Sequence, residues 1–291
     1  MKAIKTLLFA ALALLTVGCG TSNTVPITGR KTRLLVDDAQ ILSLSTQQYQ
    51  EYMQGAKLST NQTNTAMVKR VGQRLATAVE TFLTNNGYAN EVQNFQWEFN
   101  LVADNQINAF CMPGGKIVVY EGILPVTQDE ASLAIVVGHE IAHAVAKHSA
   151  EQLSKQMRQE YAAQIGGAVL TQVAQAKGMS NTAALIDMAA QMGFNFANLK
   201  YSRDNETEAD RLGLIFAAMA GYDPQVAIPF WQRMSAEGGS SQSELFSDHP
   251  SDEKRLAELQ KRMPEALQYY TPPTTTTTTT TGSKKKATTK K

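Results

Sequence analysis

The sequence predicts an α+β fold that is mostly helical, with a small antiparallel or mixed sheet beside a central helix. Helical periodicity dominates both halves of the chain, and strand-type residues are confined to one stretch between them. The 291 residues are 43% hydrophobic and 18% charged, which is typical of a globular domain. This composition excludes a collagen-like chain, a wholly disordered chain and a polytopic membrane protein.

The first half contains two predicted helices followed by the predicted sheet. Apolar residues recur at helical spacing over residues 37–52 and 66–83. The period then changes to two over residues 95–101, which predicts a half-buried strand. Two β-rich runs within residues 107–120 flank Pro113-Gly114-Gly115, so we expect two further strands joined by a turn.

The second half is predicted to be helical. Thr127 and Glu130 have the spacing of a capping box, with the threonine as N-cap of a helix that continues to Val145. Residues 157–197, rich in alanine, glutamine and methionine, predict either a helical hairpin packed on the body or a mobile lid over a cleft. Further helices are expected over 202–221, after Asp223-Pro224 and after Pro250.

The two ends of the chain differ from its centre. Residues 1–18 read as a secretory signal peptide, and Thr16 to Cys19 resemble a bacterial lipobox, so we expect lipidation of Cys19. The alternative is a plain cleavage site with an incidental cysteine. This interpretation gives a lipidated N-terminus and tether over 19–36, a folded domain over 37–270 and a disordered Thr/Lys-rich tail over 271–291. It places the protein in the bacterial cell envelope, anchored by lipid in the outer membrane and facing the periplasm.

The strongest chemical signal is the H-E-x-x-H motif formed by His139, Glu140 and His143. Residues four apart project from one face of a helix, so both imidazoles can bind one metal ion. A zinc ion lowers the pKa of water toward about 7, and Glu140 is placed to take the proton as general base. The net charge of +1 gives no basic field, so we expect no nucleic-acid partner.

Two histidines leave a catalytic zinc ion one protein ligand short. On one continuous helix His148 would lie about 180° from His139 and face away from the metal. The extended pattern with a third histidine is excluded, because Ala146 and Ser149 replace its glycine and histidine. An acidic ligand from a second helix is left, and residues 205–210 are the obvious source.

Four motifs follow one another along the chain: Asn108-Ala109-Phe110, Pro113-Gly114-Gly115, the His139 motif and Glu206-x-x-Ala209-Asp210. Their residues and their order resemble the M48 family of zinc metallopeptidases. The resemblance implies a zincin-like fold over roughly residues 60–260, one Zn²⁺ per chain, Glu206 as third ligand and Asp210 as the residue that orients a ligand histidine. Glu208 is expected to be a solvated or structural acid.

Three further residues are candidates with open alternatives. His249 can act in catalysis, by stabilising the oxyanion or by occupying the open metal position, or it is a surface histidine. Arg255 can bind substrate carbonyls or form a surface ion pair. Asn108 can help to bind the substrate backbone along an edge strand, or it stabilises a turn.

These observations predict a zinc-dependent endopeptidase that hydrolyses unfolded or misassembled cell-envelope proteins, with Glu140 activating water. The alternative is a lipid-anchored periplasmic chaperone or assembly factor with latent or secondary protease activity, which binds clients through the apolar region 157–197. Comparing the proteolytic activity of the wild-type chain with that of a Glu140 variant distinguishes the endopeptidase from the chaperone.

Overall fold

The computed structural model describes residues 21–165, 181–237 and 253–272. The predicted signal peptide, Cys19, His249, the tail beyond Pro272 and the central part of region 157–197 lie outside the described residues. In chain order the elements are β1 (Thr21–Thr24), β2 (Lys31–Leu34), α2 (Asp38–Gly55), α3 (Gln62–Asn85), α4 (Ala89–Val92), β3 (Glu98–Val102), β4 (Ala109–Met112), β5 (Lys116–Tyr120), η2 (Glu121–Ile123), α5 (Leu124–Thr127), α6 (Glu130–Val145), α7 (His148–Ile165), α9 (Thr182–Gln191), η3 (Phe196–Asn198), α10 (Arg203–Met219), η4 (Pro224–Val226), α11 (Ala227–Glu237) and α13 (Glu253–Leu267).

The main sheet has three strands in the order β3-β5-β4. β5 pairs in parallel with β3, and Glu98 lies opposite Lys116. β4 pairs antiparallel with β5, and Ala109 lies opposite Val119. The small sheet, expected to be antiparallel or mixed, is therefore confirmed and is mixed, and β4 is an edge strand of it.

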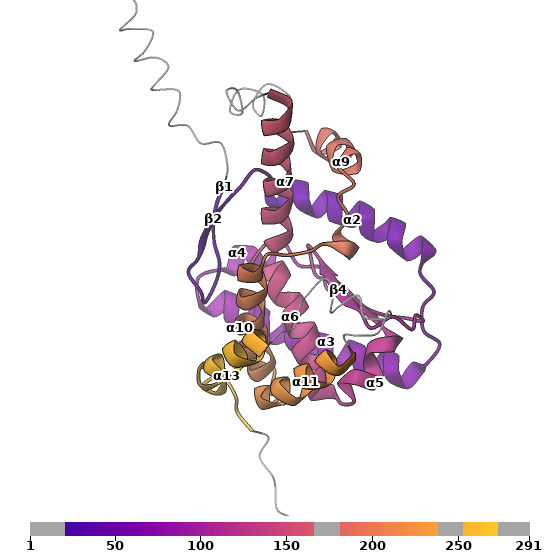
Figure 1. Ribbon diagram of the computed structural model, residues 1–291, viewed down its shortest axis with the longest axis vertical. Helices are drawn as coiled ribbons and strands as arrows, with labels where there is room; N and C mark the ends of the chain where they lie inside the picture. Colours follow the sequence, from indigo (N-terminus) through magenta and orange to yellow (C-terminus); the bar gives the residue numbers. More distant parts are fainter. Residues whose placement is uncertain (1–20, 166–180, 238–252, 273–291) are drawn as a thin grey trace, which may run out of the picture.

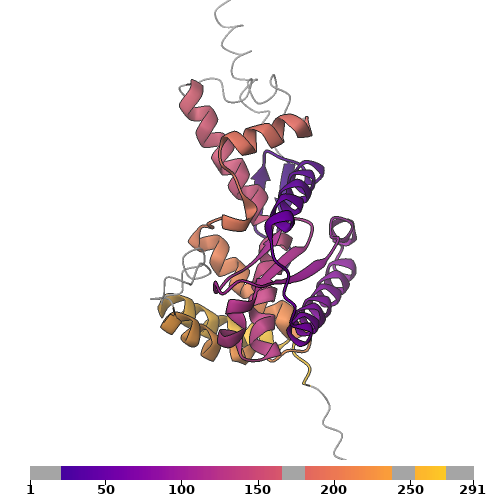
Figure 2. The same ribbon diagram turned by 90° about the vertical axis from the view of Figure 1, so that its right-hand side faces the viewer.

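Both faces of the sheet are covered, because successive side chains of a strand point to opposite faces. Ile117 and Val119 belong to a hydrophobic cluster formed with α3, α6 and α10. Val118 and Tyr120 belong to a second cluster, formed with α2, α7 and α9. α6 lies in the centre of the molecule with α10 beside it, whereas α7 and α9 project from the body (Figures 1 and 2). Within the described ranges, no helix combines the length and apolar character needed to cross a membrane.

The N-cap of the central helix α6 lies two residues after the predicted cap Thr127. Asp129 is its N-cap and accepts a hydrogen bond from the backbone N–H of Ser132 at 2.7 Å. Thr127 belongs to α5, and its hydroxyl donates to the carbonyl of Leu124 instead. A carboxylate cap suits this position, because it also interacts favourably with the positive end of the helix dipole.

Residues 21–34 are not the tether expected from their polar sequence. β1 and β2 form an antiparallel hairpin in which Thr21 lies opposite Leu34. Ile27 and Gly29 adopt positive φ angles in its turn, at 67° and 69°. Val25 is fully buried in the main core. The backbone N–H of Leu35, directly after β2, donates a hydrogen bond to the hydroxyl of Ser154 on α7 at 2.8 Å. The hairpin is thus held by contacts with residues more than a hundred positions away, which local sequence cannot reveal.

Candidate metal centre

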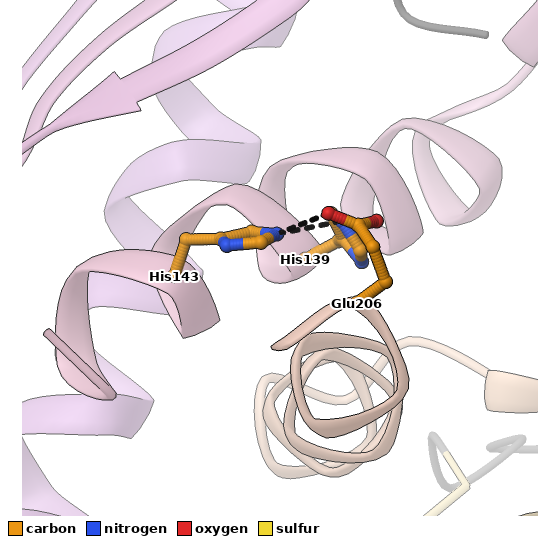
Figure 3. Close-up of side chains that lie close together, drawn as sticks. All are labelled: His139, His143 and Glu206. Carbon is orange, nitrogen blue, oxygen red and sulfur yellow. Dashed lines mark hydrogen bonds and ion pairs between the residues drawn. The ribbon is translucent and has the colours of Figure 1, made fainter. Parts of the chain in front are cut away.

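Two histidines and one glutamate meet between α6 and α10. The Nε2 atoms of His139 and His143 lie 3.0 Å apart, one turn from each other on α6. Glu206, in the first turn of α10, places its carboxylate oxygens 3.4 Å from His139 Nε2 and 3.5 Å from His143 Nε2. Figure 3 shows the three side chains converging on one point. All three are buried, so this donor set can hold a metal ion away from bulk water.

A close crossing of the two helices brings these ligands together. α6 and α10 pack against each other at Gly138 and Gly213, where no side chain separates their backbones. A Cβ atom on Gly213 would lie 2.8 Å from the backbone nitrogen of His139, which is closer than van der Waals contact. Gly213 is therefore a packing requirement of this crossing.

The second ring nitrogen of His139 is held by a carboxylate. Its Nδ1 lies 2.9 Å from Oδ1 of Asp210, one turn along α10 from Glu206. Burial lowers the pKa of His139, but hydrogen bonds to Asp210 and Glu206 outweigh it and raise the pKa to about 9. The site therefore favours a positive charge at this imidazole, which the bound proton or a metal ion can supply. A carboxylate behind a ligand histidine fixes its tautomer and orientation.

Arg255 holds that carboxylate from α13. Its Nη2 donates to Oδ1 of Asp210 at 2.6 Å, and its Nη1 lies 3.8 Å from Glu206. The guanidinium group stacks over the ring of Trp231 on α11, 3.5 Å from the ring centroid. Arg255 is only 6% exposed, so the structure places it behind the ligands rather than at the surface. Its predicted contact with substrate carbonyls stays a prediction.

The second ring nitrogen of His143 contacts another histidine. Nδ1 of His143 lies 3.0 Å from Nδ1 of His148, and Nε2 of His148 lies 3.0 Å from Glu208. Burial lowers the pKa of His148, which favours the neutral imidazole. For Glu208, burial raises the pKa, but hydrogen bonds from His148, Thr28 and Arg30 lower it to about 2.

The expected orientation of His148 is wrong because α6 and α7 are two helices. α6 ends at Val145, and Lys147 adopts a φ angle of 58° before α7 begins at His148. The ammonium group of Lys147 holds this turn through Asp38 and Glu91, each at 2.8 Å. A rotation angle computed along one continuous helix therefore does not apply. Glu208 is a structural acid as expected, but it is buried and not solvated.

Two further predicted residues, Glu140 and Asn108, are buried. Glu140 is 2% exposed, and its charge acts on the pKa values of Cys111 and Tyr201, both raised chiefly by burial. Asn108 is buried just before β4, and its side-chain oxygen accepts the backbone N–H of Ala109 at 2.8 Å. This is the turn-stabilising contact considered from the sequence, and it leaves substrate binding at β4 a prediction.

Sequence reasoning missed Tyr201 and Trp231. The ring of Tyr201 stacks on His143 with centroids 4.0 Å apart, and its hydroxyl is 2.9 Å from Ser149 Oγ. Trp231 meets His139 edge to face at 6.2 Å. Tyr201 directly precedes Ser202, the N-cap of α10. This position, next to the helix that carries Glu206, was the sequence signal that could have pointed to Tyr201.

Comparison with known proteins identifies the family. The profile of Peptidase family M48 matches residues 62–263. The chain belongs to peptidase family M48. The predicted family, zincin-like fold and metalloendopeptidase class are thereby confirmed at the level of the domain, together with a possible metal site at His139, His143 and Glu206.

Three relatives illustrate the range of similarity. The mitochondrial metalloendopeptidase OMA1 of Schizosaccharomyces pombe is 36% identical over 60% of this chain and 49% of its own length. Human metalloendopeptidase OMA1 is 31% identical over 84% of this chain and 46% of its own length. The beta-barrel assembly-enhancing protease of Escherichia coli is 26% identical over 89% of this chain and 52% of its own length. The chain thus spans about half the length of these relatives.

The expected location as an outer-membrane lipoprotein facing the periplasm is wrong. Relatives at 36% and 31% identity are mitochondrial proteins, whereas the bacterial protease is 26% identical. The expectation depended on the short apolar segment before Cys19, which lies outside the described residues. Such segments are read by targeting machinery and leave no trace in the packing of the domain, so the fold cannot support an address inferred from them.

Proposed function

We propose that the protein is a zinc-dependent endopeptidase acting on unfolded or misassembled protein chains. The observation that carries the proposal is the buried convergence of His139, His143 and Glu206 beside Glu140. Two imidazole nitrogens and one carboxylate oxygen form the donor set of a catalytic zinc site, which keeps one position open. Glu206 and Asp210 add two carboxylates to the site, and Arg255 lies against both of them.

The chemistry follows from the placement of the side chains. When bound, the metal ion supplies Lewis acidity that polarises a carbonyl and lowers the pKa of water. Glu140 accepts a proton from the attacking water and passes it to the leaving amine, a role that its position next to His139 permits. Asp210 keeps the Nδ1 proton of His139 in place, so Nε2 presents its lone pair to the metal.

The substrate class is supported by the sheet and by one relative. β4 is an edge strand of the β3-β5-β4 sheet, and an extended chain can pair with such an edge. Pairing at a strand edge is made by backbone N–H and C=O groups, which every sequence has. It therefore suits unfolded substrates of varied sequence. The narrower class of misassembled cell-envelope proteins has the support of one relative's name, the beta-barrel assembly-enhancing protease.

The test is cleavage of a fluorescently labelled unfolded protein by the purified, zinc-loaded chain. Glu140→Gln is the matched control, because it keeps the size of the side chain and leaves the ligands His139, His143 and Glu206 intact. We expect internal cleavage by the wild type and at least a hundredfold slower cleavage by the variant, with equal zinc content. Equal cleavage rates for both, or no cleavage by a zinc-loaded wild type, would reject the proposal.

A further inference from the structure

A continuous series of hydrogen-bonding side chains leads from His143 to the N-terminal hairpin. His143 contacts His148 through the two Nδ1 atoms, and His148 contacts Glu208 through Nε2, each at 3.0 Å. Both residues behind His143 are buried: His148 is 0% exposed and Glu208 is 8% exposed. Burying a polar group costs free energy unless the group is hydrogen-bonded. A buried series of this kind therefore requires a partner for each of its members.

The direction of the protons follows from the chemistry of the ligand. A histidine that presents the lone pair of Nε2 to a metal carries its proton on Nδ1. Nδ1 of His143 must then donate, so Nδ1 of His148 accepts and Nε2 of His148 carries the proton. That proton points at Oε2 of Glu208, a carboxylate that can only accept. Every donor in the series therefore meets an acceptor in a single tautomer.

The two ligand histidines are thus held in related ways. His139 contacts the carboxylate of Asp210 directly, at 2.9 Å. His143 reaches the carboxylate of Glu208 through the intervening imidazole of His148. Both carboxylates belong to α10, the helix that also provides Glu206.

The hairpin supplies the last contacts of the series. Thr28 donates from Oγ1 to Oε1 of Glu208 at 2.5 Å, and Arg30 donates from Nε to Oε2 at 2.7 Å. Arg30 also contacts Glu151 on α7, with Nη1 3.1 Å from its carboxylate. Both oxygens of Glu208 are therefore fixed from the turn between β1 and β2.

We propose that His148 is a positioning residue for the metal ligand His143, held in turn by Glu208, Thr28 and Arg30. The N-terminal hairpin, which precedes the family match over residues 62–263, then forms part of the support of the metal site. The inference rests on metal binding at His139, His143 and Glu206 and on no particular substrate.

The first experiment compares two variants of His148 in the full chain. His148→Leu fills similar space without polar atoms, whereas His148→Gln offers an amide oxygen to His143 and an amide N–H to Glu208. We expect zinc affinity, measured by competition with a chromophoric chelator, to fall about 10–100-fold in His148→Leu. The glutamine variant should recover most of this loss.

Cobalt substitution provides a readout that a packing role would not move. Co²⁺ bound in place of zinc has visible absorption that reports ligand geometry, and we expect it to change in His148→Leu and to stay close to wild type in His148→Gln. Thermal unfolding of the metal-free proteins shows whether each variant folds. Wild-type affinity and cobalt spectrum in His148→Leu, or equal losses in both variants, would overturn the proposal.

The second experiment tests the hairpin. Glu208→Gln and Arg30→Met should each weaken zinc binding, the first more strongly because Glu208 contacts His148 directly. Arg33→Met is the matched control, since Arg33 is exposed on the same hairpin. Equal zinc affinity in Arg30→Met and Arg33→Met would remove the hairpin from the proposal. Absence of zinc binding by the wild type would instead reject the proposed function, so the two failures are distinguishable.

Discussion

Replacing Gly213 by alanine tests whether the close crossing of α6 and α10 sets the spacing of the metal ligands. The new Cβ would lie 2.8 Å from the backbone nitrogen of His139 and 2.9 Å from its Cα. Ordinary van der Waals contact begins near 3.4 Å, so the two helices must separate locally by about 0.6 Å. Neither backbone atom can move aside as a flexible side chain would.

This displacement is large on the scale of a metal site. Metal–ligand distances tolerate deviations of only about 0.2 Å, and His139 lies at the contact itself. Glu206 lies on the opposite helix, so its distance from His139 changes when the helices part. We expect zinc affinity to fall about 10–100-fold, the range observed when the groups that orient a ligand are lost.

Global stability should change less than metal affinity. Overpacking a well-filled contact costs about 1–3 kcal/mol. Alanine recovers about 1 kcal/mol of helix propensity relative to glycine, so the net loss is about 0–2 kcal/mol. The two quantities are measured separately, by urea unfolding of the metal-free protein and by chelator competition.

Gly55→Ala is the control for this experiment. Gly55 is the last residue of α2, and a Cβ there would meet no atom within 4 Å. It gains similar helix propensity without a clash, so zinc affinity should match that of the wild type. If Gly213→Ala binds zinc as tightly as Gly55→Ala, the argument that the glycine crossing sets ligand spacing is refuted.

Three further outcomes are expected. Removal of the metal by a chelator should abolish cleavage and destabilise the fold by about 4 kcal/mol, relative to protein at free zinc a thousandfold above Kd, because the ion ties α6 to α10; an unchanged thermal midpoint would contradict this. Glu206→Ala should abolish stoichiometric zinc binding, and full zinc content in the variant would move the third ligand elsewhere. Hydrogen bonds from Arg211 lower the pKa of Glu265 below 4.5. The pair therefore stabilises the fold above pH 4.5 and loses this contribution as pH falls below it. Glu265→Gln should cost about 1 kcal/mol at pH 7 and less in acid, and a pH-independent difference in urea unfolding would refute the assignment.

Local sequence patterns predicted the parts of the site that depend on one element at a time. The spacing of His139 and His143 needs only a helix, and α6 provides it. Local pattern narrowed the third ligand to residues 205–210, and the family resemblance implied Glu206 and Asp210, whose spacing needs only α10. The mixed sheet followed from the change of hydrophobic period before β3 and from the turn before β5.

The errors occurred where distant residues decide the local structure. Nothing near Lys147 in the sequence signals a helix break, and its ion-pair partners Asp38 and Glu91 are distant along the chain. The β1 sequence Thr21 to Thr24 is polar and lacks the alternation that marks a half-buried strand. The strand is recognisable only from its pairing with β2, in which Thr21 lies opposite Leu34. The contact of Thr28 with Glu208 joins positions 180 residues apart. Hydrophobic periodicity along the sequence carries no information about such contacts.

The same long-range contacts reach α10 from two sides, from the N-terminal hairpin and from α13. Arg255 on α13 holds Asp210 behind His139, and Arg30 on the hairpin holds Glu208 behind His148. Each arginine contacts a mainly buried carboxylate of α10, so neither the hairpin nor α13 can detach without leaving a buried charge uncompensated. A change at the hairpin and a change at α13 should therefore weaken metal binding through different ligand histidines. Because Arg30 contacts Glu208 and Arg255 contacts Asp210, their effects on zinc affinity should be close to additive, and strong coupling between them would show that the site responds as one unit.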